Sequence, residues 1–145
     1  MDASQSLFIP VILGTARMGR MSLHAARLVT GELGKCAGVE TDLIDIAKLP
    51  LPTNDAGEAI KQADFSTKMS RADALVVVSP EYNHGYSGLL KHVLDSCLKE
   101  YIHKAVGIVG VSAALNSTLV VPEVGPPSVS ENDMRLSLGT TQIRS

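Results

Sequence analysis

The chain has 145 residues, a formal net charge of −2 and few aromatic side chains, with no tryptophan. This length suits one domain whose core is large enough to need no disulfide or metal. The small charge and the shortage of aromatic residues argue against the basic surface and stacking platforms of nucleic-acid-binding proteins. We therefore expect no nucleic-acid partner.

The two cysteines, Cys36 and Cys97, are far apart and stand among small or apolar residues. They lack the paired spacing of metal ligands, so we interpret both as reduced thiols packed in the core and expect no metal. No apolar stretch approaches the length of a membrane span, and the polar residues 1–6 do not begin a signal peptide. These features predict a cytoplasmic protein with no membrane partner.

Apolar runs alternate with amphipathic segments along the first half of the chain. Residues 7–13 are a continuous apolar run, typical of a strand covered on both faces of a parallel sheet. Apolar residues at helical spacing over 23–33 predict a helix that ends at Gly34. Residues 39–46 alternate partly, which predicts a second strand nearer a sheet edge, and the prolines within 48–57 indicate a loop.

The alternation continues to residue 112. A weak helical pattern covers 58–71, and residues 74–78 are a β-branched run typical of an interior strand. A second clear helix follows residue 88 and is predicted to end near His103 and Lys104, and residues 105–111 predict a fourth buried strand. The apolar face of the helix after residue 88 is predicted to consist of Leu90, Val93, Leu94, Cys97 and Leu98.

Alternating strands and helices with short links predict a doubly wound α/β domain with a parallel sheet. The pattern changes after Ser112, where only residues 113–117 precede the next apolar run, too few for a parallel crossover. Three prolines within 122–130 follow. We therefore predict a single domain over 1–145 in which 113–145 form a short or antiparallel edge element and irregular chain.

The loop after the first predicted strand, GTARMGRMS over 14–22, has the groups that a phosphate needs. Gly14 and Gly19 permit tight turns that bring backbone N–H groups near an anion, and the next helix points its positive N-terminus there. Two hydroxyls and two arginines add donors and charge. The loop matches neither a P-loop nor a Gly-x-Gly-x-x-Gly turn. It predicts phosphate binding, with an ordinary polar loop and two solvated arginines as the alternative.

The loop after the third predicted strand, PEYNHGYSG over 80–88, could place backbone N–H groups and an aromatic edge against a flat heterocycle. Glu81, His84 and two tyrosines make acid–base chemistry conceivable. Taken alone, the loop is better explained by Asn/Gly turns with Ser87 capping the next helix. In open α/β sheets, however, ligands bind at the carboxyl ends of strands where the strand order reverses. In one common strand order of such sheets, 2-1-3-4-5, the first and third strands flank that point, so the two loops together predict a binding site.

Other polar residues carry weaker signals. His24 and His92 fall within predicted helices and are interpreted as surface or core residues. The aspartates show no spacing that builds a metal site or a glycosidase pair. These aspartates are Asp42, Asp45, Asp64 and Asp73.

Taken together, these segments resemble the NADPH-dependent FMN reductase family, which includes quinone, azo-dye and chromate reductases. The resemblance is carried by GTARMGRMS (14–22), PEYNHGYSGLLKHVLD (80–95) and VGIVGVS (106–112), and it covers residues 7–112. It implies a flavodoxin-like three-layer sandwich with the strand order 2-1-3-4(-5). The sequence departs from the family pattern after Ser112, where the C-terminal part is shortened.

The resemblance also implies a function. FMN would be held by its phosphate at Thr15, Arg17, Arg20 and Ser22, with the isoalloxazine against residues 80–84. Because the hydride chemistry belongs to the flavin, no catalytic protein residue is implied. NADPH or NADH would reduce the flavin, and a quinone, an azo compound or free flavin would follow in ping-pong order, in a homodimer or homotetramer. The implied cofactor-binding residues are Thr15, Arg17, Met18, Gly19, Arg20, Ser22, Pro80, Glu81, Tyr82, Asn83, His84 and Ser112.

Two other functions fit the same residues. An electron carrier similar to flavodoxin usually presents an acidic docking face, which the net charge of −2 argues weakly against. A non-catalytic remnant or regulatory protein is compatible with the shortened C-terminal part.

Overall fold

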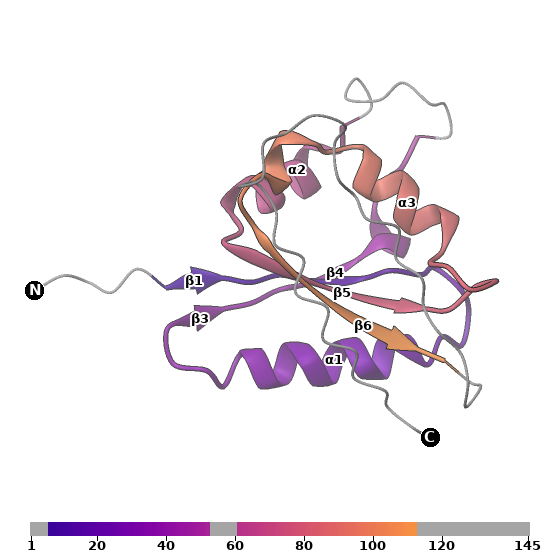
Figure 1. The fold of residues 1–145 in the computed structure, drawn as a ribbon, viewed down its shortest axis with the longest axis horizontal. Helices are drawn as coiled ribbons and strands as arrows, with labels where there is room; N and C mark the ends of the chain where they lie inside the picture. Colours follow the sequence, from indigo (N-terminus) through magenta and orange to yellow (C-terminus); the bar gives the residue numbers. More distant parts are fainter. Residues whose placement is uncertain (1–5, 53–60, 113–145) are drawn as a thin grey trace, which may run out of the picture.

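The computed structural model describes residues 6–52 and 61–112, which form a parallel sheet between helices (Figure 1). The main sheet has the order β4-β2-β5-β6, and all its pairings are parallel. Numbered as the predicted strands, this order is 2-1-3-4, so the doubly wound, flavodoxin-like prediction is confirmed. The four strands are β4 (Leu43–Asp45), β2 (Val11–Leu13), β5 (Ala74–Pro80) and β6 (Ala105–Val111).

The first two predicted strands are each divided by a short break. Residues 7–13 form β1 (Leu7–Phe8) and β2, because Pro10 has no N–H to donate to a neighbouring strand. The Pro10 carbonyl still accepts a hydrogen bond from the Val76 N–H at 3.0 Å, so the chain keeps its direction. The second predicted strand likewise forms β3 (Val39–Glu40), which pairs with β1, and β4.

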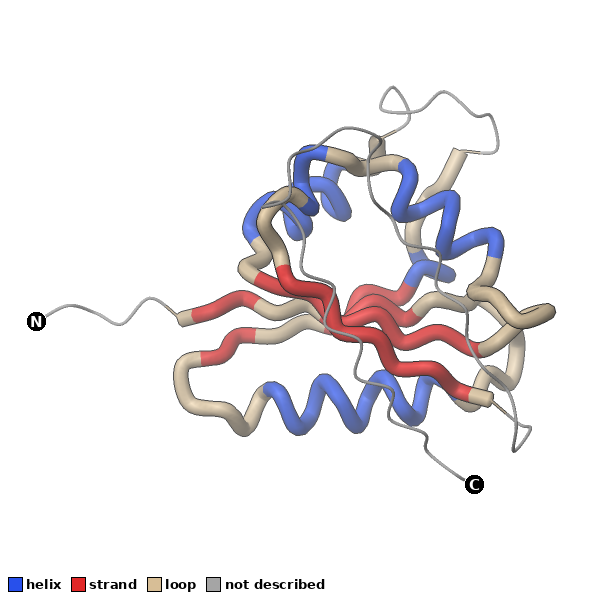
Figure 2. Tube along the Cα trace, in the orientation of Figure 1, coloured by secondary structure: helices blue, strands red, loops and turns tan. Residues whose placement is uncertain are grey.

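Helices cover both faces of the sheet (Figure 2). The helix α1 (Ser22–Leu33) lies on one face and contacts β2 and β5. The helices α2 (Ala63–Arg71) and α3 (Gly88–Asp95) lie on the other face. The α2 helix begins later than predicted because the side chain of Gln62 caps it, accepting the Phe65 N–H. The predictions for residues 58–60 and 113–145 lie outside the described residues.

Alternate residues of the central strands fill two cores, because successive strand side chains point to opposite faces. On the α1 side, Val11, Leu13 and Val78 pack with Ala25 and Ala26. The larger core faces α2 and α3, which explains why the strand sequences are apolar throughout rather than alternating. Its buried residues include Ile12, Ile44, Phe65, Met69, Leu75, Val77, Leu90 and Val93.

The segment after α3 differs from the prediction. The helix ends at Asp95, and Leu98 has non-helical backbone angles with its side chain 62% exposed. The prediction that Leu98 lies on the buried face is therefore wrong. The Glu100 carboxylate accepts the Leu98 N–H at 3.1 Å, and a short 3-10 turn, η3 (Lys99–Tyr101), replaces the continued helix.

The two cysteines also have different environments. Cys97 is buried, as predicted, whereas Cys36 is exposed beyond the end of α1, so its prediction as a core residue is wrong. Burial raises the pKa of the Cys97 thiol, and the nearby Glu100 carboxylate raises it further. Cys97 is therefore a packing residue with little thiolate character.

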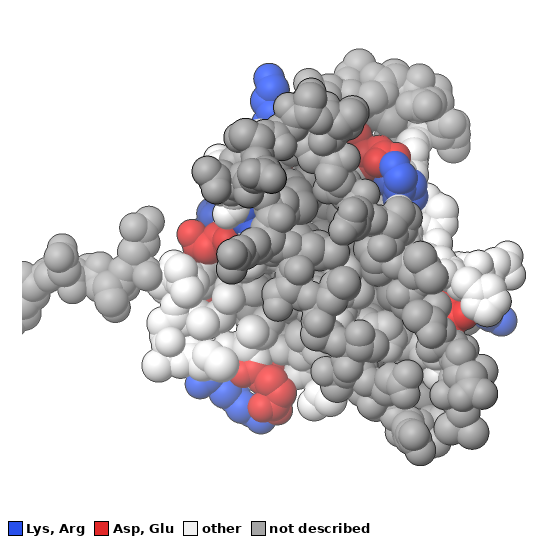
Figure 3. Space-filling view, in the orientation of Figure 1, with Lys and Arg blue, Asp and Glu red and all other residues white. Residues whose placement is uncertain are grey.

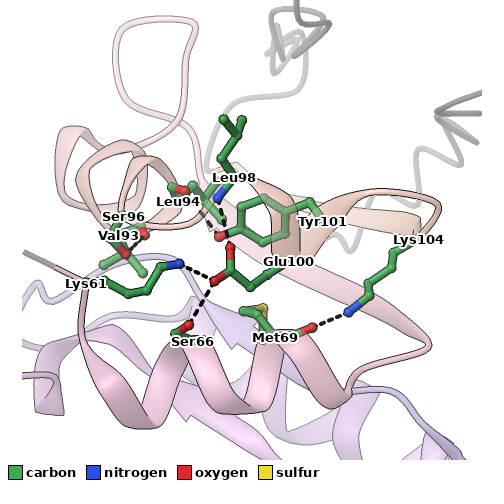
Figure 4. A network of polar contacts seen from close by, with 10 residues as sticks. All are labelled: Lys61, Ser66, Met69, Val93, Leu94, Ser96, Leu98, Glu100, Tyr101 and Lys104. Carbon is green, nitrogen blue, oxygen red and sulfur yellow. Dashed lines mark hydrogen bonds and ion pairs between the residues drawn. The ribbon is translucent and has the colours of Figure 1, made fainter. Parts of the chain in front are cut away.

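A polar network joins α2 to the chain that leads into β6 (Figure 4). The Glu100 carboxylate, only 8% exposed, accepts hydrogen bonds from the Lys61 ammonium and from the Ser66 hydroxyl at 2.9 Å. Burial opposes ionisation, but these donors outweigh it and hold the pKa of Glu100 at about 2. The Lys104 ammonium donates to the Met69 carbonyl at the end of α2.

On the face that Figure 3 shows, the visible charged side chains of both signs are interspersed. Figure 3 shows blue basic and red acidic atoms side by side around the rim of the face in view. No helix within the described ranges is long and apolar enough to cross a membrane. Residues 6–52 and 61–112 also contain no group of three or more His, Cys, Asp or Glu side chains placed to hold a metal ion.

Candidate functional site

The loops after β2 and β5 meet at the carboxyl end of the sheet. The two strands are neighbours, with Leu13 paired to Val78, so the chain leaves the sheet at adjacent positions. The Gly14 N–H donates to the Val78 carbonyl at 2.8 Å. Farther along, the Thr15 and Tyr82 hydroxyls share a hydrogen bond of 2.9 Å. The strand order thus brings the two loops into direct contact, as the sequence predicted.

A cavity of about 640 Å³ opens between these loops and the first turns of α1. This volume is within the usual range of small-molecule pockets. Of the twelve predicted cofactor-binding residues, ten line the cavity, whereas Asn83 and His84 are exposed and are not among the lining residues. The ten are Thr15, Arg17, Met18, Gly19, Arg20, Ser22, Pro80, Glu81, Tyr82 and Ser112.

The start of α1 lines the cavity. Gly19 has a φ of +65°, in the left-handed region that favours glycine, and it lies where the loop leads into the helix. No side chain caps α1, because Met21 occupies the N-cap position. Ser22 is 2% exposed, and its hydroxyl has no hydrogen-bond partner in the described part of the chain. A positive helix end with a buried, unpartnered hydroxyl is suited to an anion.

The two arginines of this loop differ in their contacts. Arg17 is exposed at the cavity. Arg20 forms an ion pair with Asp45, with Nη2 at 2.5 Å from Oδ2, and its Nη1 donates to the Thr15 carbonyl at 2.5 Å. Both members of the pair are largely buried, at 14% and 11% exposed. Arg17 therefore has its charge available toward the cavity, whereas Asp45 neutralises Arg20.

The loop after β5 contains a tight two-residue turn. The backbones of Tyr82 and Gly85 exchange hydrogen bonds of 2.8 and 3.0 Å. Asn83 and His84 between them have φ values of +51° and +64°, the signature of a type I′ turn. The turn expected from the sequence is therefore present, but Asn83 and His84, rather than Asn and Gly, occupy its two central positions.

Ser87 connects the two loops while it caps α3. Its hydroxyl oxygen accepts the Leu90 N–H at 3.1 Å, which confirms the predicted cap. The same hydroxyl donates to the Gly14 carbonyl at 2.7 Å. One buried side chain thus fixes the start of α3 relative to the start of the first loop.

Glu81 lines the cavity from the loop after β5. Its backbone N–H donates to the Val111 carbonyl at 3.1 Å, which holds the loop against the end of β6. Its carboxylate is 12% exposed, with Oε1 at 3.2 Å from His84 Nδ1. The second oxygen, Oε2, is buried without a hydrogen-bond partner among the described residues. Two of the lining residues, Ser22 and Glu81, thus each have a buried polar atom without a partner among the described residues, a potential donor and a potential acceptor.

Comparison with known proteins identifies the family. The family model described as NADPH-dependent FMN reductase matches residues 8–135. The chain belongs to this family. The match extends beyond Ser112, where the resemblance drawn from the motifs ended.

The FMN-dependent NADPH-azoreductase of Staphylococcus haemolyticus (strain JCSC1435) is 32% identical over 117 residues, covering 74% of this chain and 62% of that protein. The azoreductase of Staphylococcus aureus (strain USA300) has the same identity and coverage. The chain therefore spans about 62% of the length of these curated relatives.

Solved structures show the same fold. An NADH:FMN oxidoreductase (EMOB, apo form) superposes with a TM-score of 0.64 at 20% identity, covering 76% of this chain and 60% of that one. The NAD(P)H:acceptor oxidoreductase FerB from Paracoccus denitrificans gives a TM-score of 0.57 at 23% identity, over 75% and 63% of the two chains.

Sequence reasoning missed several residues of the cavity of this FMN reductase family member. Asp45, which is not among the lining residues but pairs with Arg20, was dismissed as a metal ligand, although its place at the carboxyl end of β4, beside β2, is a signal of proximity to the loop. Four residues on the first turns of α1 were also missed, and their spacing of three or four residues marks one helix face. The missed lining residues are Met21, His24, Ala25, Leu28 and, on β6, Val111.

Proposed function

We propose that this chain binds FMN in the cavity and uses NAD(P)H to reduce a small, flat acceptor in ping-pong order. The observation that carries the proposal is the buried Ser22 hydroxyl at the start of α1, which has no partner among the described residues, in a cavity that the exposed Arg17 also lines. A buried polar group without a partner is costly, and a phosphate at this place would supply the missing partner.

The phosphate end of the proposed site has three kinds of donor. The start of α1 contributes its positive end, Ser22 a hydroxyl, and Arg17 a charged fork. The Thr15 oxygen accepts the Arg17 N–H at 3.3 Å and also contacts the Tyr82 hydroxyl. Because a hydroxyl has one hydrogen, Thr15 can donate to a phosphate only when Tyr82 donates to Thr15. The second loop thereby helps to set the donors of the first.

The ring end of the proposed site is formed by Pro80, Glu81 and Tyr82. The unpartnered Glu81 oxygen can accept a hydrogen bond from a ring or ribityl donor. FMN, when bound, supplies the hydride chemistry, so the protein residues have to hold, orient and shield it. The contacts of Asn83 and His84 with the ring, predicted by resemblance, remain part of the proposal.

The choice of acceptor, the assembly and the location are proposed on family grounds. The azoreductase names of the staphylococcal relatives favour an azo compound among the three acceptor classes, with a quinone or free flavin as the others. We expect a cytoplasmic homodimer or homotetramer with a single domain over residues 1–145.

The test starts with the purified full chain and FMN. Quenching of flavin fluorescence measures the dissociation constant, and anaerobic addition of NADPH should bleach the bound flavin. Reoxidation by a quinone or an azo dye, with parallel double-reciprocal plots, should then show ping-pong order. Failure of a folded chain to bind FMN contradicts the proposal, whereas binding without bleaching by NADPH or NADH indicates an electron carrier.

A Ser22→Ala variant tests the deciding observation. We expect FMN binding to weaken by about 1.5–3 kcal/mol, the contribution of a hydrogen bond to a charged group. The free energy of unfolding without FMN should not fall, because the hydroxyl has no partner among the described residues to lose. Ser70→Ala, on the exposed side of α2, is the matched control. Equal FMN affinity of the two variants argues against a phosphate at Ser22.

A further inference from the structure

Arg20 occupies a position in the anion loop where a direct contact with phosphate is the simple expectation. Its guanidinium is instead directed to two protein acceptors. Nη1 donates to the Thr15 carbonyl at the beginning of the loop, and Nη2 donates to Asp45 at the end of β4. The planar fork makes both bonds at once, which a lysine ammonium would not reproduce with the same geometry.

Asp45 is itself held in place from two directions. The pairing of β2 with β4 puts Asp45 opposite Leu13, next to the start of the loop. Its second oxygen, Oδ1, accepts the Ala47 N–H at 3.0 Å and caps the short turn η1 (Ile46–Lys48). Contacts other than the one with Arg20 therefore hold the carboxylate in place, and Arg20 binds to a fixed group beside the loop.

We propose that Arg20 and Asp45 are a positioning pair that holds the 15–20 loop around the cavity, so that anion affinity depends on a carboxylate that does not touch the anion. The inference rests on the proposed function. Arg20 connects Thr15 at one end of the loop with its own position at the other, and Asp45 ties both to the sheet. Direct charge toward the ligand then comes from Arg17.

Neutralising Asp45 changes FMN affinity in opposite directions under the two possible roles of Arg20. If Arg20 bound the phosphate directly, neutralising Asp45 would remove a competing negative charge and tighten FMN binding. If the pair positions the loop, Asp45→Asn weakens FMN binding even though it removes a negative charge near the anion. Asparagine keeps an oxygen for the Ala47 N–H, so the cap of η1 is preserved.

The experiment is a double-mutant cycle on the full chain. We expect Arg20→Ala and Asp45→Asn each to raise the FMN dissociation constant about tenfold, which corresponds to about 1.4 kcal/mol. The double variant should be no weaker than Arg20→Ala, and Arg20→Lys should resemble Arg20→Ala. The control Glu32→Gln removes the carboxylate of an exposed ion pair with Lys35 and should leave the constant unchanged. Tighter binding by Asp45→Asn, additive losses, or full affinity in Arg20→Lys overturns the proposal.

Amide hydrogen exchange without FMN separates this inference from the proposed function. Exchange over residues 15–21 should accelerate equally in Arg20→Ala and Asp45→Asn, and remain at the wild-type rate in Glu32→Gln. If the wild-type chain binds no FMN, the proposed function fails, and exchange alone still tests the pair. Unchanged exchange in both variants overturns the positioning role, and so does accelerated exchange with unchanged FMN affinity in a chain that binds FMN.

Discussion

Replacing Gly14 by alanine tests the close contact on which both loops depend. A Cβ atom at this position would lie 2.7 Å from a methyl carbon of Leu90 and 3.1 Å from the Val78 carbonyl oxygen. The Val78 carbonyl cannot move away from the new methyl group, because it belongs to the backbone of a central strand and accepts the Gly14 N–H. Leu90 is 2% exposed within the larger core, so its side chain has little room to rotate.

The magnitude follows from overpacking. A methyl group forced into a packed core typically costs about 1–3 kcal/mol, and the smaller entropy of the unfolded alanine chain offsets about 0.4–1 kcal/mol. We therefore expect Gly14→Ala to lower the free energy of unfolding by about 1–2 kcal/mol and to weaken FMN binding, since the Gly14 carbonyl also accepts the Ser87 hydroxyl.

Urea unfolding monitored by circular dichroism measures this effect. The matched control is Gly31→Ala in α1, where a Cβ atom meets nothing within 4 Å. There the substitution should stabilise the chain by about 0.5–1 kcal/mol and leave FMN affinity unchanged. If Gly14→Ala has the free energy of unfolding of the wild type, and the same slope of this free energy against urea concentration, the steric reasoning for this site is refuted.

Two further substitutions test the charges. Glu100 has its pKa lowered from 4.5 to about 2, so its contribution is complete above pH 4.5 and is lost as the pH falls toward 2. Glu100→Gln should therefore cost about 2 kcal/mol at neutral pH, because it leaves the Lys61 ammonium without this carboxylate, and should flatten the stability between pH 4.5 and 2. Thermal unfolding across this range checks it, and an unchanged pH dependence contradicts it. Arg17→Ala should weaken FMN binding by about 1.5–3 kcal/mol in a fluorescence titration, whereas Arg27→Ala, the same change at an exposed position of α1 outside the cavity lining, should not. Equal constants for the two arginine variants would remove Arg17 from the site.

The local residue pattern predicted the bounds of one strand but not the end of one helix. Residues 105–111 were predicted as a strand from composition, and β6 has these bounds. The end of the helix after residue 88 was not predictable in the same way. Leu98 fits the apolar period, but the Glu100 carboxylate, drawn inward by Lys61 and Ser66 of another segment, takes its N–H. A long-range ion pair thus overrides helical periodicity.

In the candidate site, too, the sequence predicted which residues gather but not the contacts that they make. Glycines, hydroxyls and arginines in the first loop, and turn formers in the second, were evident from residue types, and strand order placed them at one sheet edge. The different contacts of Arg17 and Arg20 were not evident, since both are arginines three residues apart in one loop. The difference depends on Asp45, which β-sheet pairing brings beside the loop from 25 residues away.

For this protein, the sequence by itself determined the order of strands and helices, their parallel arrangement and the family, because burial and backbone preference depend on local residue patterns. Only the tertiary structure decided which polar groups have partners. It pairs Arg20 with Asp45 and leaves the Ser22 hydroxyl and one Glu81 oxygen without partners in the described chain. The physical reason is that hydrogen bonds and ion pairs act over a few ångströms, and such distances exist only after strands remote in sequence have paired.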